Sequence, residues 1–416
     1  MLPTTAFLQI DLQARYPRNA LLLSDLFSVL RQRPRLNLPA PKQSDDSPVC
    51  LPDPQVRVFR IAALMYVVNW TLLHSGNYDQ HEPRELFALA CALLGWYRRL
   101  YPQGQVAVTE ALSGIPDTDI AEVVPLDTKP SEFFWDLGLI VGGEETRCSG
   151  LLQTWLTALV QKPLRLLLPS TQLHLRPLTN QVPEHGEIPV DFSKPFIVRK
   201  ACTWPAMQSW GSLEFLSDQP DRLVPVEIGS TYLDARWTQR LITVRELLND
   251  HWTPMWEGKQ VPLAYLAQHP LLDQWPHLQQ DVCMPPPCPL STLRLFWAGP
   301  GGTVSPLHTD PLENCFVQVV GTKYMRIMPP SSGDAVRAFS SFFSNTSSVN
   351  EDFLDGLRPE TSPESFSAEF TAAPFLETYV HPGDLLFFPR GYWHYVKACR
   401  GQPICISISH WWEVNT

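Results

Sequence analysis

The order of apolar and polar residues divides the chain into two parts with different periods. In the first 170 residues, four stretches repeat apolar side chains at intervals of three and four, as a helix with one buried face requires. We therefore predict helices at 19–30, 56–73, 86–100 and 151–167. No cluster of titratable residues follows one face of these helices. The pattern favours an all-helical scaffold for docking over a catalytic unit.

A proline-rich stretch follows, and after it the period changes. Residues 169–195 contain five prolines, so we predict a linker at 171–194 between a helical domain at 1–170 and a second domain at 195–416. The second domain has short apolar runs separated by glycine and proline, which is typical of an antiparallel sandwich or barrel. The predicted strands are 194–199, 223–228, 292–297, 316–320, 323–328, 385–389 and 403–408. The fold class is thus α+β, and the Ser-, Pro- and acid-rich segment 331–373 is predicted to be a surface insertion.

Composition narrows the classes of function. The 416 residues include 32 Lys and Arg against 42 Asp and Glu, and a net charge of −10 does not favour direct nucleic-acid binding. Apolar runs such as 61–68 are far shorter than the ~20 residues of a membrane span, so no membrane partner is expected. The nine cysteines are scattered and form no Cys-x-x-Cys pair, which predicts neither a disulfide framework nor a zinc knuckle. With no signal-peptide pattern at the N-terminus, we expect an intracellular protein of the nucleus, the cytoplasm or both.

The residues with the most chemical content lie in the second domain. His308 and Asp310 follow a glycine-rich turn at 299–302, and in a strand both side chains would project from one face. A second histidine, His394, follows a Pro-Gly-Asp turn at 382–384 and a Phe-Phe-Pro run. Two imidazoles and one carboxylate form the facial triad that holds non-haem Fe(II) and leaves three positions open. Two of these suit a bidentate 2-oxo acid, and the third suits dioxygen.

The tripeptide His-x-Asp carries little weight alone, because this composition produces roughly 0.6 such pairs by chance. The prediction depends on the set: the glycine-rich turn, the distal histidine and a lysine, Lys323, that stands 15 residues after His308.

As a set, these residues resemble the JmjC-domain 2-oxoglutarate/Fe(II) oxygenases, whose fold is the cupin-like double-stranded β-helix. The likeness covers about 195–412, roughly half of the chain, and within the family it is greatest to the arginyl hydroxylases. The segments that carry it are 225–230, 265–269, 308–324, 392–396 and 409–412. The chain departs from the family pattern in the 331–373 segment and at His410.

The resemblance implies a role for each matching residue, with Fe(II), 2-oxoglutarate and O2 as cofactors. Iron would be bound by His308, Asp310 and His394. The cosubstrate would be held by Lys323, Tyr265, Ser305 and Asn314, with the lysine neutralising its distal carboxylate. The substrate would be faced by Glu227 and Trp297. The ordinary alternatives are a solvated lysine, a surface glutamate, and core packing for the tyrosine, the asparagine and the tryptophan.

The reaction that follows is hydroxylation of a protein or peptide side chain, with arginine at carbon as the predicted target. A carboxylate can hold a guanidinium by two parallel hydrogen bonds, and an indole can stack on its plane. One alternative is N-methyl-lysine (histone) demethylation, which needs an aromatic or carbonyl cage around a methylammonium group. Others are a catalytically silent JmjC scaffold that binds partners through its helical half, and a cupin isomerase, which would use more histidine ligands.

Overall fold

In the computed structural model the chain forms two units, residues 1–160 and 161–416. The structure describes residues 81–100, 129–143, 148–159, 163–173, 175–229, 236–286, 291–340, 344–349 and 367–413, with parts of 59–73 and positions 146, 288 and 289. The helix predicted at 19–30 lies outside the described residues, and the described part of 56–73 is almost entirely helical. None of the described helices has the length and apolar content needed to cross a bilayer.

The first unit contains three described helices of some length, α4 (His81–Leu100), α6 (Ser131–Gly142) and α7 (Ser149–Thr157). Helix α4 confirms the prediction at 86–100 and begins earlier. It lies close to α6 because α6 presents glycines at the crossing: a Cβ atom at Gly138 would lie 2.9 Å from the Cβ atom of Cys91, and one at Gly142 would lie 2.8 Å from that of Ala88. Small residues thus set the distance between these two helices.

Two helix predictions in this unit were incomplete. Helix α6 was not predicted, because nearly all of its residues are apolar and buried, so no polar face marks a period of 3.6. The helix predicted at 151–167 was wrong in its second half, since α7 ends at Thr157. Residues 163–170 have no helix there, and leucines 164, 166 and 168 pack at a spacing of two on the core of the second unit.

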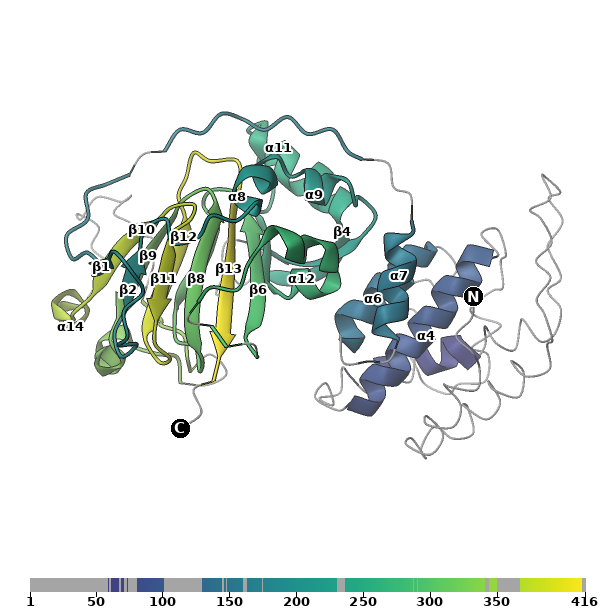
Figure 1. The fold of residues 1–416 in the computed structure, drawn as a ribbon, viewed down its shortest axis with the longest axis horizontal. Helices are drawn as coiled ribbons and strands as arrows, with labels where there is room; N and C mark the ends of the chain where they lie inside the picture. The colour runs from purple at the N-terminus through teal and green to yellow at the C-terminus, as the bar shows by residue number, and fades with distance from the viewer. Residues whose placement is uncertain are drawn as a thin grey trace. The chain divides into compact units, whose positions relative to one another are not determined.

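The second unit is built from two sheets, which Figure 1 shows as strands packed side by side, with α8, α9, α11 and α12 beside them. The larger sheet has the described strands β1 (Glu184–His185), β2 (Phe196–Val198), β11 (Leu385–Phe388), β8 (Glu313–Val320), β13 (Cys405–Trp412), β6 (Leu293–Gly299), β5 (Ala264–His269), β3 (Leu223–Ile228) and β4 (Thr238–Thr243), in spatial order. The smaller sheet has the order β10 (Leu376–Val380), β9 (Lys323–Met328), β12 (Trp393–Ala398) and β7 (Val304–His308). The short helices of this unit are α8 (Ala206–Ser209), η4 (Trp210–Ser212), α9 (Glu214–Ser217), α10 (Val244–Glu246), η5 (Leu247–Trp252), α11 (Thr253–Trp256), α12 (Leu271–Gln274), η6 (Pro276–Asp281), η7 (Pro330–Ser332), α13 (Gly333–Val336) and α14 (Ala368–Ala372).

The two sheets pack face to face around an apolar cluster. Phe316 of β8 lies in this cluster with Met325 of β9 and Val396 of β12. The next residue along β8, Val317, points to the opposite face, where the short helices close a second cluster. Each predicted strand segment overlaps an observed strand, and the α+β class is confirmed. Strands such as the edge strand β4 lack an apolar run and were not predicted.

Residues 163–194 are attached to this second unit. The backbone N–H of Leu164 donates to Ser217 O, and that of Gln172 donates to Gly401 O. Arg176 pairs with Glu377 of β10. The segment predicted as a linker therefore follows the surface of the β-rich unit for much of its length. The domain limits expected from the sequence, at 170 and 195, stay a prediction.

The described parts of the 331–373 segment cover the outer face of the smaller sheet. Val336 of α13 and Phe370 of α14 are buried against Leu307 of β7 and Tyr395 of β12. This segment therefore contributes a third apolar cluster, on the side of the smaller sheet that faces away from the larger one.

Candidate metal centre

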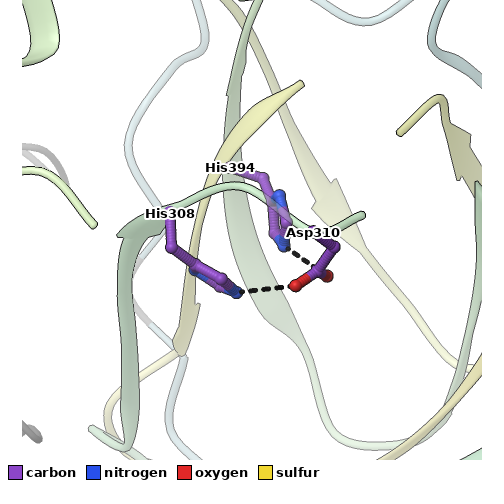
Figure 2. A group of neighbouring side chains, drawn as sticks. All are labelled: His308, Asp310 and His394. Carbon is purple, nitrogen blue, oxygen red and sulfur yellow. Dashed lines mark ion pairs between the residues drawn. The ribbon is translucent and has the colours of Figure 1, made fainter. Parts of the chain in front are cut away.

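Two neighbouring strands of the smaller sheet bring the predicted iron ligands together. His308 is the last residue of β7 and stands directly opposite His394 of β12 in the antiparallel register. Asp310 follows two residues later, and its backbone carbonyl accepts a hydrogen bond of 2.9 Å from the N–H of Gly391, in the turn before β12. Figure 2 shows the three side chains pointing toward one another. Their ligand atoms all lie within 4.8 Å of one another.

Backbone carbonyls orient the two imidazoles. Nδ1 of His308 lies 2.6 Å from the carbonyl oxygen of Pro306, and Nδ1 of His394 lies 3.1 Å from that of Tyr392. A carbonyl oxygen can only accept, so each Nδ1 carries the proton and each Nε2 presents a lone pair. The Nε2 atoms of His308 and His394 lie 3.7 and 3.3 Å from the carboxylate oxygens of Asp310.

The two Nε2 atoms and the carboxylate of Asp310 are therefore three acceptor groups that face one point. The buried Oδ2 atom of Asp310 has no hydrogen-bond donor among the described residues. Burial lowers the pKa of His308 to about 4, so this imidazole is neutral at pH 7. Burial would raise the pKa of Asp310, but the hydrogen bond from the Asn314 amide helps to hold it below its usual value.

A buried anion beside two nitrogen lone pairs is costly unless a cation joins them. The donor set therefore fits a divalent metal ion, and two imidazoles with one carboxylate are the set that non-haem Fe(II) takes.

The three ligands line a cavity of about 320 Å³, counting the part that is open to solvent. Its lining includes eight of the nine predicted site residues, namely His308, Asp310, His394, Lys323, Tyr265, Ser305, Asn314 and Trp297. Its apolar wall is made by Phe316, Met325, Phe388 and Val396. The ninth residue, Glu227, lies outside this wall.

Lys323 is a buried cation in this cavity, 2% exposed. Its Nζ atom donates to the hydroxyl oxygens of Ser407 at 2.8 Å and Tyr265 at 3.1 Å, which are both neutral groups. Burial lowers its pKa to about 8. The alternative of a solvated strand lysine does not describe this position.

The other three predicted cosubstrate ligands lie on different strands around the cavity. Tyr265 of β5 shares a hydrogen bond with Ser305 of β7, and the lack of a side chain at Gly299 leaves room for its ring, since a Cβ atom there would lie 2.7 Å from it. Asn314 of β8 is buried, and its Oδ1 atom has no donor among the described residues. An unpaired acceptor facing a cavity is open to a ligand or a bound water.

Glu227 and Trp297 lie on either side of Tyr265. Glu227 of β3 is directly opposite Tyr265 of β5 in the register, so the two side chains share one face of the larger sheet. The Trp297 ring lies 5.9 Å from the Tyr265 ring, centroid to centroid, and its Nε1 donates to Ser409 Oγ at 3.1 Å. Burial raises the pKa of Glu227, and among the described residues no Lys or Arg acts on this carboxylate.

Sequence reasoning missed the contribution of β13. Ser407 holds Lys323, whereas Ser409 and Trp411 line the cavity. Their spacing of two within an otherwise apolar strand was the available signal, because it marks a face that meets polar groups. His410, where the chain departs from the family pattern, points to the opposite face and bonds the carbonyl oxygen of Cys315 through Nδ1.

Comparison with known proteins agrees with this geometry. A family model described as a cupin-like domain matches residues 189–416. The chain is 38% identical over 219 residues to a Xenopus tropicalis protein named lysine-specific demethylase 8, covering 50% of this chain and 46% of that protein. It is 37% identical over 226 residues to an Arabidopsis thaliana protein named lysine-specific demethylase JMJ30, covering 52% and 49%. A human protein named bifunctional peptidase and (3S)-lysyl hydroxylase JMJD7 is 23% identical over 266 residues, covering 54% of this chain and 78% of that protein. The aligned part spans about half the length of the first two relatives.

Proposed function

The chain belongs to the cupin-like domain family, whose JmjC oxygenases use Fe(II), 2-oxoglutarate and dioxygen, and from this premise we propose that it hydroxylates a protein side chain, arginine at carbon. One observation carries the proposal: a facial set of metal ligands and a buried lysine line the same cavity. A metal-binding cupin without a 2-oxo acid cosubstrate has no need of a buried ammonium group there.

Each group has a task in this reaction. Bound iron supplies the oxidation, with 2-oxoglutarate and dioxygen as co-reactants. His308, Asp310 and His394 hold the metal, and the carbonyls behind the imidazoles fix the ring orientation. Lys323 pairs with the distal carboxylate of the cosubstrate, while the apolar wall excludes water around that pair.

The choice of arginine is supported by the row Glu227, Tyr265 and Trp297. The Glu227 carboxylate is partly buried and has no cation acting on it among the described residues, so an incoming cation would relieve the cost of its burial. A guanidinium can bind it through two parallel hydrogen bonds and stack on the indole, whereas an ammonium lacks the planar fork.

The test uses the full chain with Fe(II), ascorbate, 2-oxoglutarate and peptides that differ only at a central arginine, lysine or dimethyl-lysine. We expect the arginine peptide to gain one oxygen atom in the mass spectrum. Glu227→Gln should lower this gain by at least about tenfold, while Glu257→Gln, at an exposed glutamate that pairs with Lys259, should not. Equal turnover of the arginine and lysine peptides would refute the arginine assignment.

The second candidate is demethylation of N-methyl-lysine, favoured by the names of two of the similar proteins. The same peptides decide between the two, because demethylation removes a methyl group from the dimethyl-lysine peptide. Loss of methyl without any oxidised arginine would select this candidate.

We also propose a protein or peptide as the partner and the nucleus or cytoplasm as the location. The eight described cysteines are all free, which suits a reducing compartment. Fractionation of cells that express a tagged chain tests the location.

A further inference from the structure

Part of the 331–373 segment forms a β-hairpin against the metal-binding strand. Its two arms are joined by a hydrogen bond from the N–H of Phe339 to Thr346 O and one from the N–H of Ser348 to Arg337 O. The second arm then pairs with β7: the N–H of Ser347 donates to Leu307 O at 2.8 Å. The composition of this segment predicts only a surface insertion, so the pairing adds a structural role.

The pairing lies where β7 needs it. Strand β7 is at the edge of the smaller sheet, so its outer backbone groups lack a partner within that sheet. The hairpin supplies this partner, and Thr346 stands directly opposite His308. Opposed residues of antiparallel strands share one face, so Thr346, which is 1% exposed, packs beside the metal ligand.

Asn345 holds the residue between the two ligands of the His-x-Asp turn. Its carbonyl oxygen accepts from the N–H of Thr309 at 2.9 Å, and its side-chain Nδ2 donates to the carbonyl oxygen of Thr309 at 3.1 Å. Both peptide groups of Thr309 are thereby fixed. These peptide groups connect Thr309 to His308 on one side and to Asp310 on the other, so their orientation sets the relative positions of the two ligands.

We propose that Asn345 is a positioning residue for the metal, so that the hairpin tunes metal affinity. The inference rests on the metal site of the proposed function. The physical reason is preorganisation: a ligand pair held in its binding geometry before the metal arrives loses less freedom on binding. Groups behind the ligands typically change metal affinity by about 10- to 100-fold when removed.

The test is calorimetric titration of Mn(II) alone into the full chain and three variants. Asn345→Ala removes the side-chain hydrogen bond, and we expect Mn(II) to bind about tenfold more weakly. Asn345→Asp keeps the shape but loses the N–H donor. Its added negative charge would by itself tighten cation binding, so weaker binding by this variant isolates the lost hydrogen bond.

Ser348→Ala is the matched control. Ser348 is also exposed on the hairpin and also donates to a backbone carbonyl, but its partner is Arg337 O, within the hairpin. We expect Mn(II) affinity within twofold of the wild type for this variant. A second readout separates positioning from misfolding: succinate production by Asn345→Ala should recover at saturating Fe(II), because only the affinity has changed.

The outcomes are distinct. Unchanged Mn(II) affinity in both Asn345 variants, an equal loss in Ser348→Ala, or no recovery at saturating Fe(II) would overturn this inference and leave the proposed function standing. Failure of the wild type to bind Mn(II) would overturn both.

Discussion

The strongest consequence of the site concerns Lys323, whose buried ammonium group donates to two neutral hydroxyls, those of Ser407 and Tyr265, and forms no ion pair with a described residue. Lys323→Ala removes the only Lys or Arg among the described residues that line the cavity. Removing one partner of a buried ion pair costs about 3–5 kcal/mol, because the remaining charge stays unpaired. At 1.36 kcal/mol for each tenfold change, 2-oxoglutarate should bind roughly 200- to 5000-fold more weakly. Mn(II) affinity should stay close to the wild-type value, because Lys323 is not a predicted metal ligand.

The neighbouring arginines do not replace this lysine. Lys323 and Met325 of β9 both line the cavity, and alternation along the strand turns Arg326 to the other face, where it bonds the Tyr324 hydroxyl. Arg294 pairs with Asp273 at 3.3 Å. A compensating cation is therefore not expected from either position.

The assay is titration of 2-oxoglutarate into Mn(II)-loaded protein without oxygen, with Lys259→Ala as an exposed-lysine control. Lys323→Met preserves much of the side-chain volume, so a loss shared by both Lys323 variants reflects the charge and not a cavity. A loss smaller than tenfold in both variants would refute the assignment of Lys323 to the cosubstrate carboxylate.

The pKa of Lys323 adds a second signature. Burial lowers this pKa to about 8, so the lysine is charged below pH 8 and increasingly neutral above it. Binding of the dicarboxylate above pH 8 must then take up a proton, and 2-oxoglutarate affinity should fall by up to about tenfold per pH unit. Lys323→Met should lose this dependence.

Three further predictions follow from the site and the fold. Asp310→Ala leaves two metal ligands, so Mn(II) binding and succinate production should both vanish. Adding His308→Ala to this variant should cause no further loss. Normal succinate production by Asp310→Ala would exclude the triad. Glu227→Gln should lower peptide hydroxylation by at least about tenfold while substrate-independent 2-oxoglutarate decarboxylation persists, because a neutral amide lacks the charge that holds a guanidinium; full activity would remove Glu227 from the substrate site. Burial would raise the pKa of Glu377, but hydrogen bonds from Arg176, Thr179 and Tyr324 lower it to about 2. The lowered pKa of Glu377 contributes about 3 kcal/mol to the free energy of unfolding. This contribution is present above pH ~4.5 and is lost as the pH falls toward 2. Urea unfolding at several pH values should show this loss, and Glu377→Gln should flatten it.

The metal site was predictable because its signal is local. His308 and Asp310 are only two residues apart, so their side chains stay close even though β7 ends at His308 and does not reach Asp310. His394 was found from its own sequence context, although its strand, β12, was not predicted. The strand register that places the two histidines opposite each other could not be predicted from the sequence, because strand pairing depends on contacts between distant segments. The hairpin around Asn345 was not predicted for the same reason, since the sequence of a polar segment that pairs with an edge strand resembles that of a loop.

Helix α6 shows the opposite limit. Its sequence is strongly apolar, so burial was expected, but a segment buried on all sides has no periodic contrast from which a helix could be assigned. Ser407 is a third case: its spacing of two from Ser409 marks one face of an apolar strand, but only the position of Lys323 on β9 shows that its hydroxyl faces a buried cation.

The register of the smaller sheet also limits the length of the cosubstrate. His394 of β12 is opposite Ile327 of β9, whereas Lys323 stands four residues earlier, opposite Ala398. Four residues of a strand span ~13 Å, and the lysine side chain and the dicarboxylate together must cross this distance. Since Lys323 is buried and its Nζ is held by Ser407 and Tyr265, it has little freedom to follow an acid of another length. Oxaloacetate, one carbon shorter than 2-oxoglutarate, should leave the lysine unpaired, and 2-oxoadipate, one carbon longer, should press against it. We therefore expect turnover to fall by at least about tenfold with either acid, measured as carbon dioxide release, since an unmade buried pair costs more than 1.4 kcal/mol. Equal turnover with 2-oxoadipate would mean that the carboxylate is bound elsewhere in the cavity.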